Sequence, residues 1–392
     1  MRRISGAVTI ALVSPKRSAT KRIAQAPALP SMAELEDIRR TCRRFLGGHG
    51  HRSTAEQLAA IPQDVQADSY GDGGVVAELE AKIATLLGKP TAVFVPSGTM
   101  GQQIVLRVHA DRRNRRTVLY HPQCHLAVHE LGAAQRLHGL QGRAVGDRNR
   151  LISIDDLRIA PDGRTPIAEA PAALLLELPQ RDIGGQLPPW KDLVAQVDWA
   201  HSVGAAAHMD GARLWQCAGF YERSLDAIAA PFDTVYVSFY KDVGALAGAA
   251  VAGPADVIAE VREWRQRHGG TLYSMWPHAA SALANLRARL PRMPSYQAHA
   301  LALADALRNL PGLQLVPDPP QSSMFHLVLH RDAEALQAAA LRLAKDERIW
   351  TWGAFYATEV PGISRTELSV GDATLLWTPA EFRGVIASLL AG

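Results

Sequence analysis

The sequence predicts an α/β protein with a large, doubly wound, mostly parallel sheet and a smaller C-terminal α+β domain. Three observations lead to this prediction. From about residue 53 to about residue 260, strand-like runs alternate with helix-like runs, the order expected when helices connect parallel strands. Several strand-like runs are apolar throughout, which suits strands buried on both faces. Beyond residue 270, two Ala- and Leu-rich helices lead into a second, shorter set of strands and helices.

The elements of the first region can be placed from these runs. The predicted strands are Ala92–Val95, Thr117–Tyr120, Ala173–Leu178, Ala205–Met209, Val235–Tyr240 and Ala247–Ala252. The predicted helices include Val75–Leu87, Met100–His109, Trp190–His201 and Ala255–His268. Their alternation assigns residues 31–270 to the large domain.

The second region begins with helices Ala279–Leu290 and Ala298–Leu307, which Pro291 and Pro294 interrupt. We expect these helices to join the two domains, and residues 271–392 to include the small domain. Its predicted strands are Leu313–Val316, Met324–Leu329 and Thr366–Val370, and its predicted helices are Ala333–Lys345 and Pro379–Leu390. Residues 1–30 are expected to be an extra, mobile N-terminal arm.

Lys241 is the most informative residue of the chain. It follows a run rich in Val, Tyr and Phe. The segment after it contains small residues that let the backbone pack close to a ligand: Gly244, Ala245, Ala247, Gly248 and Ala249. A buried lysine must lose its charge or find a partner, and its neutral amine is a nucleophile toward carbonyls. This suggests covalent attachment to the aldehyde of pyridoxal phosphate (PLP). The alternative is a surface lysine at a strand end.

Asp210 is the second candidate. It ends the apolar run that begins at Ala205, and open α/β sheets bind ligands at the carboxyl ends of their strands. The pyridinium nitrogen of PLP needs an acidic partner, because a protonated ring is the electron sink. Arg213, three residues later, could face a phosphate or a carboxylate. The alternative is that Asp210 caps the following helix.

A phosphate loop is predicted at Ser97, Gly98 and Thr99, between a strand and a helix. Hydroxyls and free backbone N–H groups at a helix N-terminus bind anions, although the same tripeptide would equally cap a helix. The phosphate loop, the acidic residue and the lysine occur in the order expected for a PLP enzyme of the aspartate-aminotransferase-like fold.

The chain resembles the threonine aldolase / β-eliminating lyase family of PLP enzymes, from about Asp68 to Gly270. The resemblance is carried by five segments: Tyr70–Asp72 with Val76–Glu80, Phe94–Met100, His125 with Glu130–Gly132, His208–Arg213, and Arg267–Gly270. It implies PLP-dependent transferase-like fold type I. It also implies that His125 stacks on the cofactor ring, and that the Gly-rich loop approaches a neighbouring subunit's site in a homodimer or homotetramer.

The chain departs from this family at three places. Family aldolases carry Glu-Asn-Thr-His before the aspartate motif, and here Gln180 stands where that histidine would be. Gln180 cannot take a proton at neutral pH, so threonine is not expected to be the best substrate. Near the C-terminus the alignment with the family slips, and Arg365 is the candidate for the family's carboxylate-binding arginine. His49 and His51, in a changed N-terminal segment, could supply a base or could lie in a polar loop.

Composition narrows the class of protein. The 392 residues carry a formal net charge of only +4, and 47% are hydrophobic, as in an ordinary globular enzyme. The basic run Asp111–Arg116 lacks interleaved aromatic residues and is expected to be a solvated turn, so no nucleic-acid partner is predicted. Cys42, Cys124 and Cys217 are expected to be free thiols, and no metal-binding spacing is present.

No apolar stretch approaches the roughly 18 residues of a membrane span. Residues 1–13 resemble a short signal peptide, but charged residues follow directly, so a cytoplasmic location is expected. The resemblance implies that Lys241, Asp210 and His125 carry the catalysis, that Ser97–Thr99 hold the phosphate with help near Ser238, and that Arg213, Arg365 and Gln180 meet the substrate.

The expected reaction is retro-aldol cleavage of a β-hydroxy amino acid to glycine and an aldehyde. The alternatives within the same enzyme class are β-elimination and α-proton chemistry such as racemisation. A different class, a regulatory protein that binds a ligand without turnover, would be indicated by loss of Lys241 or Asp210, and both are present.

Overall fold

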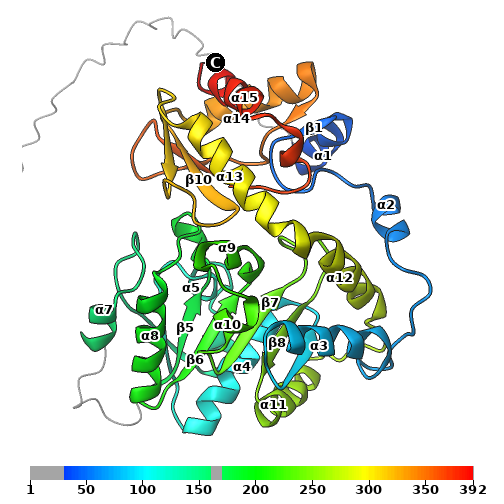
Figure 1. The fold of residues 1–392 in the computed structure, drawn as a ribbon, viewed down its shortest axis with the longest axis vertical. Coiled ribbons are helices and arrows are strands. Elements are labelled where there is room, and N and C mark those ends of the chain that lie inside the picture. The colour runs from blue at the N-terminus through cyan, green and yellow to red at the C-terminus, as the bar shows by residue number, and fades with distance from the viewer. Residues whose placement is uncertain (1–30, 160–169, 392) are drawn as a thin grey trace, which may run out of the picture.

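A computed structural model describes residues 31–159 and 170–391 of the chain. The predicted arm of residues 1–30 lies outside this part. Seven strands form the large sheet at the bottom of Figure 1, in the order β2-β8-β7-β6-β5-β3-β4. Its strands are β2 (Thr91–Val95), β3 (Thr117–Tyr120), β4 (Gln141–Ala144), β5 (Pro171–Glu177), β6 (Ala206–Gly211), β7 (Thr234–Ser238) and β8 (Ala249–Gly253).

The large sheet is parallel except at β8, which pairs antiparallel with both β2 and β7. Every residue of β5, β6, β7 and β8 is buried, which explains their uniformly apolar or small sequences. All six predicted strands of this region are present, each with ends within two residues of the prediction. The sequence did not reveal β4, because this strand is polar and fully exposed.

Helices cover both faces of the large sheet, as the doubly wound prediction requires. Apolar side chains of α4 (Gly98–Arg113) and α11 (Ala255–Arg267) pack with Val93 and Val95 on one face. Those of α3 (Gly74–Leu86) and α8 (Trp190–Ser202) pack with Phe94 on the other. Shorter helices occur in the segments that connect the strands along the chain: α5 (His125–Val128), α6 (Ala133–His138), α7 (Ile154–Ile159), α9 (Ala218–Tyr221) and α10 (Leu225–Ala229).

Two helices connect the large sheet to the small one (Figure 1). They are α12 (Trp276–Arg289) and α13 (Met293–Leu307), with one short 3-10 turn at Leu290–Arg292 between them. The prediction that the second helix begins at Ala298 was wrong. Pro294 lies in the first turn of α13, where the missing N–H of proline has no intrahelical partner to lose.

The small sheet is antiparallel, with the order β12-β13-β10-β9. It comprises β9 (Leu313–Val316), β10 (Met324–Leu329), β12 (Tyr356–Ala357) and β13 (Ser364–Ser369), and packs with α14 (Ala333–Arg342) and α15 (Pro379–Ala391). The N-terminal elements α1 (Met32–Thr41) and β1 (Arg44–Phe45) lie beside these C-terminal elements, since β1 pairs with β11 (Ile349–Trp350), whereas α2 (Thr54–Ala59) leads back toward the large sheet (Figure 1). A domain boundary near residue 270 stays a prediction.

Within residues 31–159 and 170–391, no helix combines the length and apolar character needed to cross a membrane. The same residues contain no group of three or more His, Cys, Asp or Glu side chains arranged to hold a metal ion. The three cysteines are free and buried.

Candidate active site

The predicted site residues converge at the carboxyl ends of three adjacent strands. Glu177 ends β5, Asp210 lies at the end of β6, and β7 ends at Ser238, three residues before Lys241. Glu177 and Asp210 are register partners across β5 and β6. Parallel strands bring their carboxyl ends to the same edge of a sheet, which is where open α/β sheets bind ligands.

Lys241 lies in a largely buried environment, and burial is the main cause that lowers the pKa of its amine. The positive charge of Arg213 lowers that pKa further, while Asp210, Glu177 and Asp242 oppose the change. The effect is to increase the fraction of neutral, nucleophilic amine.

Among the described residues, three buried polar atoms at or just after the ends of β6 and β7 lack hydrogen-bond partners. Ser238 Oγ, Asp242 Oδ2 and Arg213 Nε are buried without a hydrogen-bond partner in the part of the chain that the structure describes. Buried polar groups are nearly always hydrogen-bonded, so these atoms indicate a place built for a polar ligand.

Asp210 is 1% exposed, and its Oδ1 accepts a hydrogen bond from the Ala212 N–H at 3.1 Å. Burial raises the pKa of its carboxyl group, although Lys241 and His125 act in the opposite direction. Burial and the charge of Asp210 together raise the pKa of Glu177. The two carboxyl groups therefore form a buried pair that resists carrying two negative charges.

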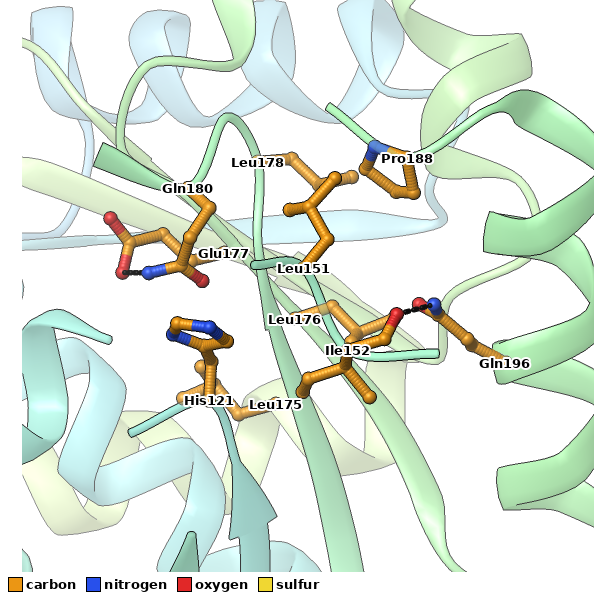
Figure 2. Close-up of a pocket in the computed structure, with 10 residues that line it drawn as sticks. All are labelled: His121, Leu151, Ile152, Leu175, Leu176, Glu177, Leu178, Gln180, Pro188 and Gln196. Atoms are coloured by element: carbon orange, nitrogen blue, oxygen red, sulfur yellow. Dashed lines mark hydrogen bonds between the residues drawn. The ribbon is translucent and has the colours of Figure 1, made fainter. Parts of the chain in front are cut away.

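Glu177 was not singled out from the sequence, although an acidic residue ending a wholly apolar strand was a usable signal. Its carboxylate accepts hydrogen bonds from the N–H of His125 at 2.8 Å and the N–H of Arg181 at 3.1 Å. It also accepts one from Gln180 Nε2 at 3.3 Å, drawn as a dashed line in Figure 2. Glu177 thus ties the loop after β3 to the loop after β5.

Gln180 is buried, and its side-chain amide also donates to the backbone oxygen of Gln123 at 3.1 Å. The side-chain amide of Gln180 therefore donates its hydrogen bonds to groups of the protein itself. The residue lines a small cavity of about 20 Å³ with His121 and Glu177 (Figure 2), large enough for about one water molecule.

His125 begins α5, and its ring is held by a buried carboxylate. Its Nδ1 lies 3.0 Å from Glu130 Oε1, so Nδ1 carries a proton and donates it to that hydrogen bond. Glu130 in turn accepts from Gln103 Nε2 at 3.2 Å. These contacts fix the orientation of the imidazole ring next to the Glu177–Asp210 pair.

The predicted phosphate loop forms a helix N-terminus. Ser97 is the N-cap residue of α4, and its Oγ accepts from the Met100 N–H at 3.3 Å. The helix therefore begins at Gly98, two residues before the predicted start. A Cβ atom on Gly98 would lie 2.0 Å from the hydroxyl oxygen of Tyr236 in β7, so only glycine fits at this point. The free N–H groups and the helix dipole suit a phosphate.

The arginines predicted to meet a substrate are already paired. Arg213 Nη2 lies 3.2 Å from Glu367 Oε1, and its Nε lies 3.7 Å from Asp242 Oδ1. Arg365 donates to the backbone oxygen of Asp182 at 3.0 Å. Glu367 and Asp242 had no role in the sequence-based prediction, because nothing local marks their contact with Arg213.

The two N-terminal histidines differ sharply in their surroundings. Both line a cavity of about 420 Å³ that Lys241 also lines. His49 uses both ring nitrogens: Nε2 donates to the Asp242 backbone oxygen at 2.7 Å, and Nδ1 accepts from the Asp372 N–H at 3.2 Å. Burial and Arg289 lower its pKa. His51 bonds only through Nε2, which lies 3.0 Å from Glu36 Oε1, within the described residues.

Comparison with known proteins agrees with this geometry. The family model for beta-eliminating lyases matches residues 50–330. A solved structure of a putative L-allo-threonine aldolase from Listeria monocytogenes is 37% identical, with a TM-score of 0.83, covering 91% of this chain and 98% of that one.

Two curated proteins are also similar. Aldolase VrtJ of Penicillium aethiopicum is 34% identical over 222 residues, 56% of each chain. Low-specificity L-threonine aldolase 1 of Arabidopsis thaliana is 27% identical over 75% of this chain and 82% of its own length. With a helix N-terminus at Gly98, a strand-end aspartate and a nearby lysine on a fold of PLP-dependent type I, the chain belongs to the beta-eliminating lyase family of PLP-dependent enzymes.

Proposed function

We propose that this protein cleaves a β-hydroxy amino acid to glycine and an aldehyde. The observation that carries the proposal is the convergence of Lys241, Asp210 and the helix N-terminus at Gly98 on one edge of the large sheet. The similarity to aldolases that act on threonine or allo-threonine supports the same reaction class.

The residues at the site fit PLP. Gly98 lets the N-terminus of α4 pack against Tyr236, where any side chain would meet the Tyr236 hydroxyl, and Ser238 Oγ is a buried hydroxyl that lacks a partner among the described residues. Ser97, Gly98 and Thr99 would hold the phosphate, Lys241 the aldehyde carbon, Asp210 the ring nitrogen and His125 the ring face. When bound, PLP supplies an electron sink for the substrate's α-carbon.

The chain's own residues then have three tasks. The Arg213 and Arg365 guanidiniums orient the substrate carboxylate. The Asp210 carboxyl group would hold the ring nitrogen of bound PLP in its protonated form. A base removes the proton of the substrate's β-hydroxyl, the Cα–Cβ bond breaks, the aldehyde C=O forms, and the α-carbon regains a proton to give glycine.

The best-placed base is His51. With its Nε2–H donated to Glu36, its Nδ1 lone pair is available, whereas both nitrogens of His49 are engaged. The hydrogen bond to Glu36 also holds the imidazole ring of His51 in one orientation. His51 thereby takes the role that Gln180 cannot fill.

β-Elimination and α-proton exchange are the second candidate, and Gln180 is the observation that favours them. An amide that donates to Glu177 and to the Gln123 backbone offers no base beside the substrate.

We further propose that the enzyme is a cytoplasmic homodimer or homotetramer. The exposed rings of Tyr70 and Tyr273, 5.2 Å apart, form an aromatic surface suited to a second copy near the Gly269–Gly270 loop.

The reaction type can be tested with a panel of β-hydroxy amino acids and β-substituted alanines. Glycine plus aldehyde, and ammonia plus 2-oxo acid, are assayed separately, and loss of optical activity is followed with alanine. Glycine and aldehyde are the expected products. Ammonia and 2-oxo acid from every substrate would replace the aldolase proposal with β-elimination, and racemisation without cleavage would indicate α-proton exchange.

A further inference from the structure

Glu367 lies between two guanidinium groups at the edge of the active site. Its Oε2 is 2.7 Å from Arg181 Nε, and its Oε1 is 3.2 Å from Arg213 Nη2. Each carboxylate oxygen therefore meets a different arginine. This is the arrangement in which a free carboxylate ligand would be bound by two arginines.

Glu367 and its two arginine partners come from different sheets of the fold. Glu367 lies on β13 of the small sheet, on the same face as Arg365, because alternate residues of this strand are buried and half-buried. Arg181 and Arg213 follow the strand ends of Glu177 and Asp210 in the large sheet. Glu367 thus reaches across from one sheet to the arginines of the other.

Glu367 is ionised in this setting. Burial raises the pKa of its carboxyl group, but Arg213, Arg181 and His326 outweigh burial, and the net effect lowers it. Arg213 also acts on the reactive lysine, because its charge helps to lower the pKa of Lys241. A group that binds or releases Arg213 therefore acts directly at the site.

The α-carboxylate of an amino acid substrate is expected at Arg213, with Arg365 on the same strand face as Glu367. Two carboxylates cannot both bind the Arg213 guanidinium without like-charge repulsion in a buried site. We propose that Glu367 is a built-in competitor for the substrate carboxylate: in the substrate-free protein it binds Arg213 together with Arg181, and it is displaced from Arg213 when substrate binds. This inference rests on the proposed function, since it assumes an amino acid substrate.

The role makes Glu367 a residue that sets affinity for substrate and leaves the bond-breaking step to other residues. In the absence of substrate, it neutralises two arginines that would otherwise repel each other. On binding, part of the substrate's interaction energy is used to release Glu367, which raises KM without changing kcat. A permanent structural ion pair would have the opposite signature, because its removal would disorder the arginines and weaken binding.

The first experiment measures anion binding on cofactor-free protein and needs no turnover. Thermal unfolding is followed during titration with sodium acetate, at constant ionic strength, for wild type, Glu367→Ala and Glu367→Gln. Glu359→Ala is the matched control, because Glu359 is an exposed residue of the same region that pairs with Arg148 at 2.9 Å. A ligand that binds the folded state raises the midpoint of unfolding.

We expect acetate to stabilise both Glu367 variants in a saturable manner, with half-saturation at an acetate concentration at least tenfold lower (about 1.4 kcal/mol) than for wild type or Glu359→Ala. Should Glu367→Ala not fold, the isosteric Glu367→Gln carries the same test. No gain in acetate binding by either variant, with both proteins folded, would overturn the proposal.

The second experiment is steady-state kinetics on the holoenzyme with the best β-hydroxy amino acid. We expect Glu367→Gln to lower KM about fivefold or more while kcat stays within about twofold, the pattern of changed ground-state binding. A raised KM would show that Glu367 positions the arginines for substrate and would overturn the inference. If no tested amino acid is turned over, the proposed function fails, but the acetate titration still decides the role of Glu367.

Discussion

Glu177 and Asp210 are register partners at the ends of β5 and β6, and both carboxyl groups are buried. Glu177 accepts hydrogen bonds from the loops that carry His125 and Gln180, and Asp210 accepts one from Ala212. The two acids therefore combine two functions. They join the loops around the site, and their buried carboxyl groups favour a proton or a neighbouring positive charge beside Lys241.

This pair predicts a pH dependence of stability in the cofactor-free protein. The pKa of each group is raised in the folded state. Its stabilising contribution is therefore full below the unfolded value of about 4 and is lost as pH rises toward neutral. In Glu177→Gln, which removes one charge, the midpoint of unfolding relative to wild type should increase between pH 4 and pH 8.

The measurement is thermal unfolding of both proteins across that range. Glu263→Gln is the control, because Glu263 is exposed and pairs only with Arg267 four residues away among the described residues. Parallel pH curves for wild type and Glu177→Gln would show that the pair does not repel as described.

Lys241→Ala should abolish covalent retention of PLP and lower turnover at least ~10³-fold, the scale lost when a nucleophilic catalytic group is removed. Borohydride reduction followed by peptide mapping locates the modified lysine. Lys82→Ala, at an exposed position of α3, should keep both properties. A reduced adduct on any other lysine would contradict the site.

Gly98→Ala should weaken PLP binding and destabilise the protein by roughly 1–3 kcal/mol, the usual cost of overpacking. The new methyl group would lie 2.0 Å from the Tyr236 hydroxyl oxygen and press the helix N-terminus away from β7. Bound PLP is measured by absorbance and stability by urea unfolding. Gly384→Ala, in α15 with no heavy atom within 4 Å of the new Cβ, should be neutral or stabilising.

His51→Gln should lower kcat for β-hydroxy amino acids by about 10²–10⁴-fold, the usual contribution of a positioned base, with little change in the midpoint of unfolding. His49→Gln should instead reduce stability, because it breaks the bonds to Asp242 and Asp372. The two variants are compared by kinetics and thermal unfolding. Normal kcat in His51→Gln would exclude His51, and a gain of threonine cleavage in Gln180→His would then identify position 180 as the place for the base.

The fold was largely predictable from the sequence, because buried parallel strands are apolar throughout and their order along the chain dictates a doubly wound sheet. Strands without such an apolar run were missed. β4 is exposed and polar, and β1 and β11 have only two residues each, so they are recognisable only from their pairing in the folded protein. Lys241, Asp210 and Gly98 could be found because each stands at a strand or helix end.

Other parts of the site depend on contacts that span the chain and leave no local pattern. Glu367 meets Arg213, 154 residues away, and nothing around Glu367 indicates this pairing. The difference between His49 and His51 is likewise invisible in the sequence, since it depends on which partner each ring reaches. Glu177 is intermediate. An acidic residue at the end of an apolar strand is a clear local signal, but its role became clear only from the three groups that donate hydrogen bonds to it.

The two hydrogen bonds of His49 link parts of the chain that are synthesised at very different times. Through one ring nitrogen His49 holds the backbone next to Lys241, and through the other it meets Asp372, 323 residues further along the chain. A ribosome therefore delivers the lysine, the aspartate and the phosphate loop long before the residue that closes this link. A chain truncated after β13, which ends at Ser369, would therefore contain all the predicted cofactor-binding residues and still lack the Asp372 N–H from which His49 Nδ1 accepts a hydrogen bond.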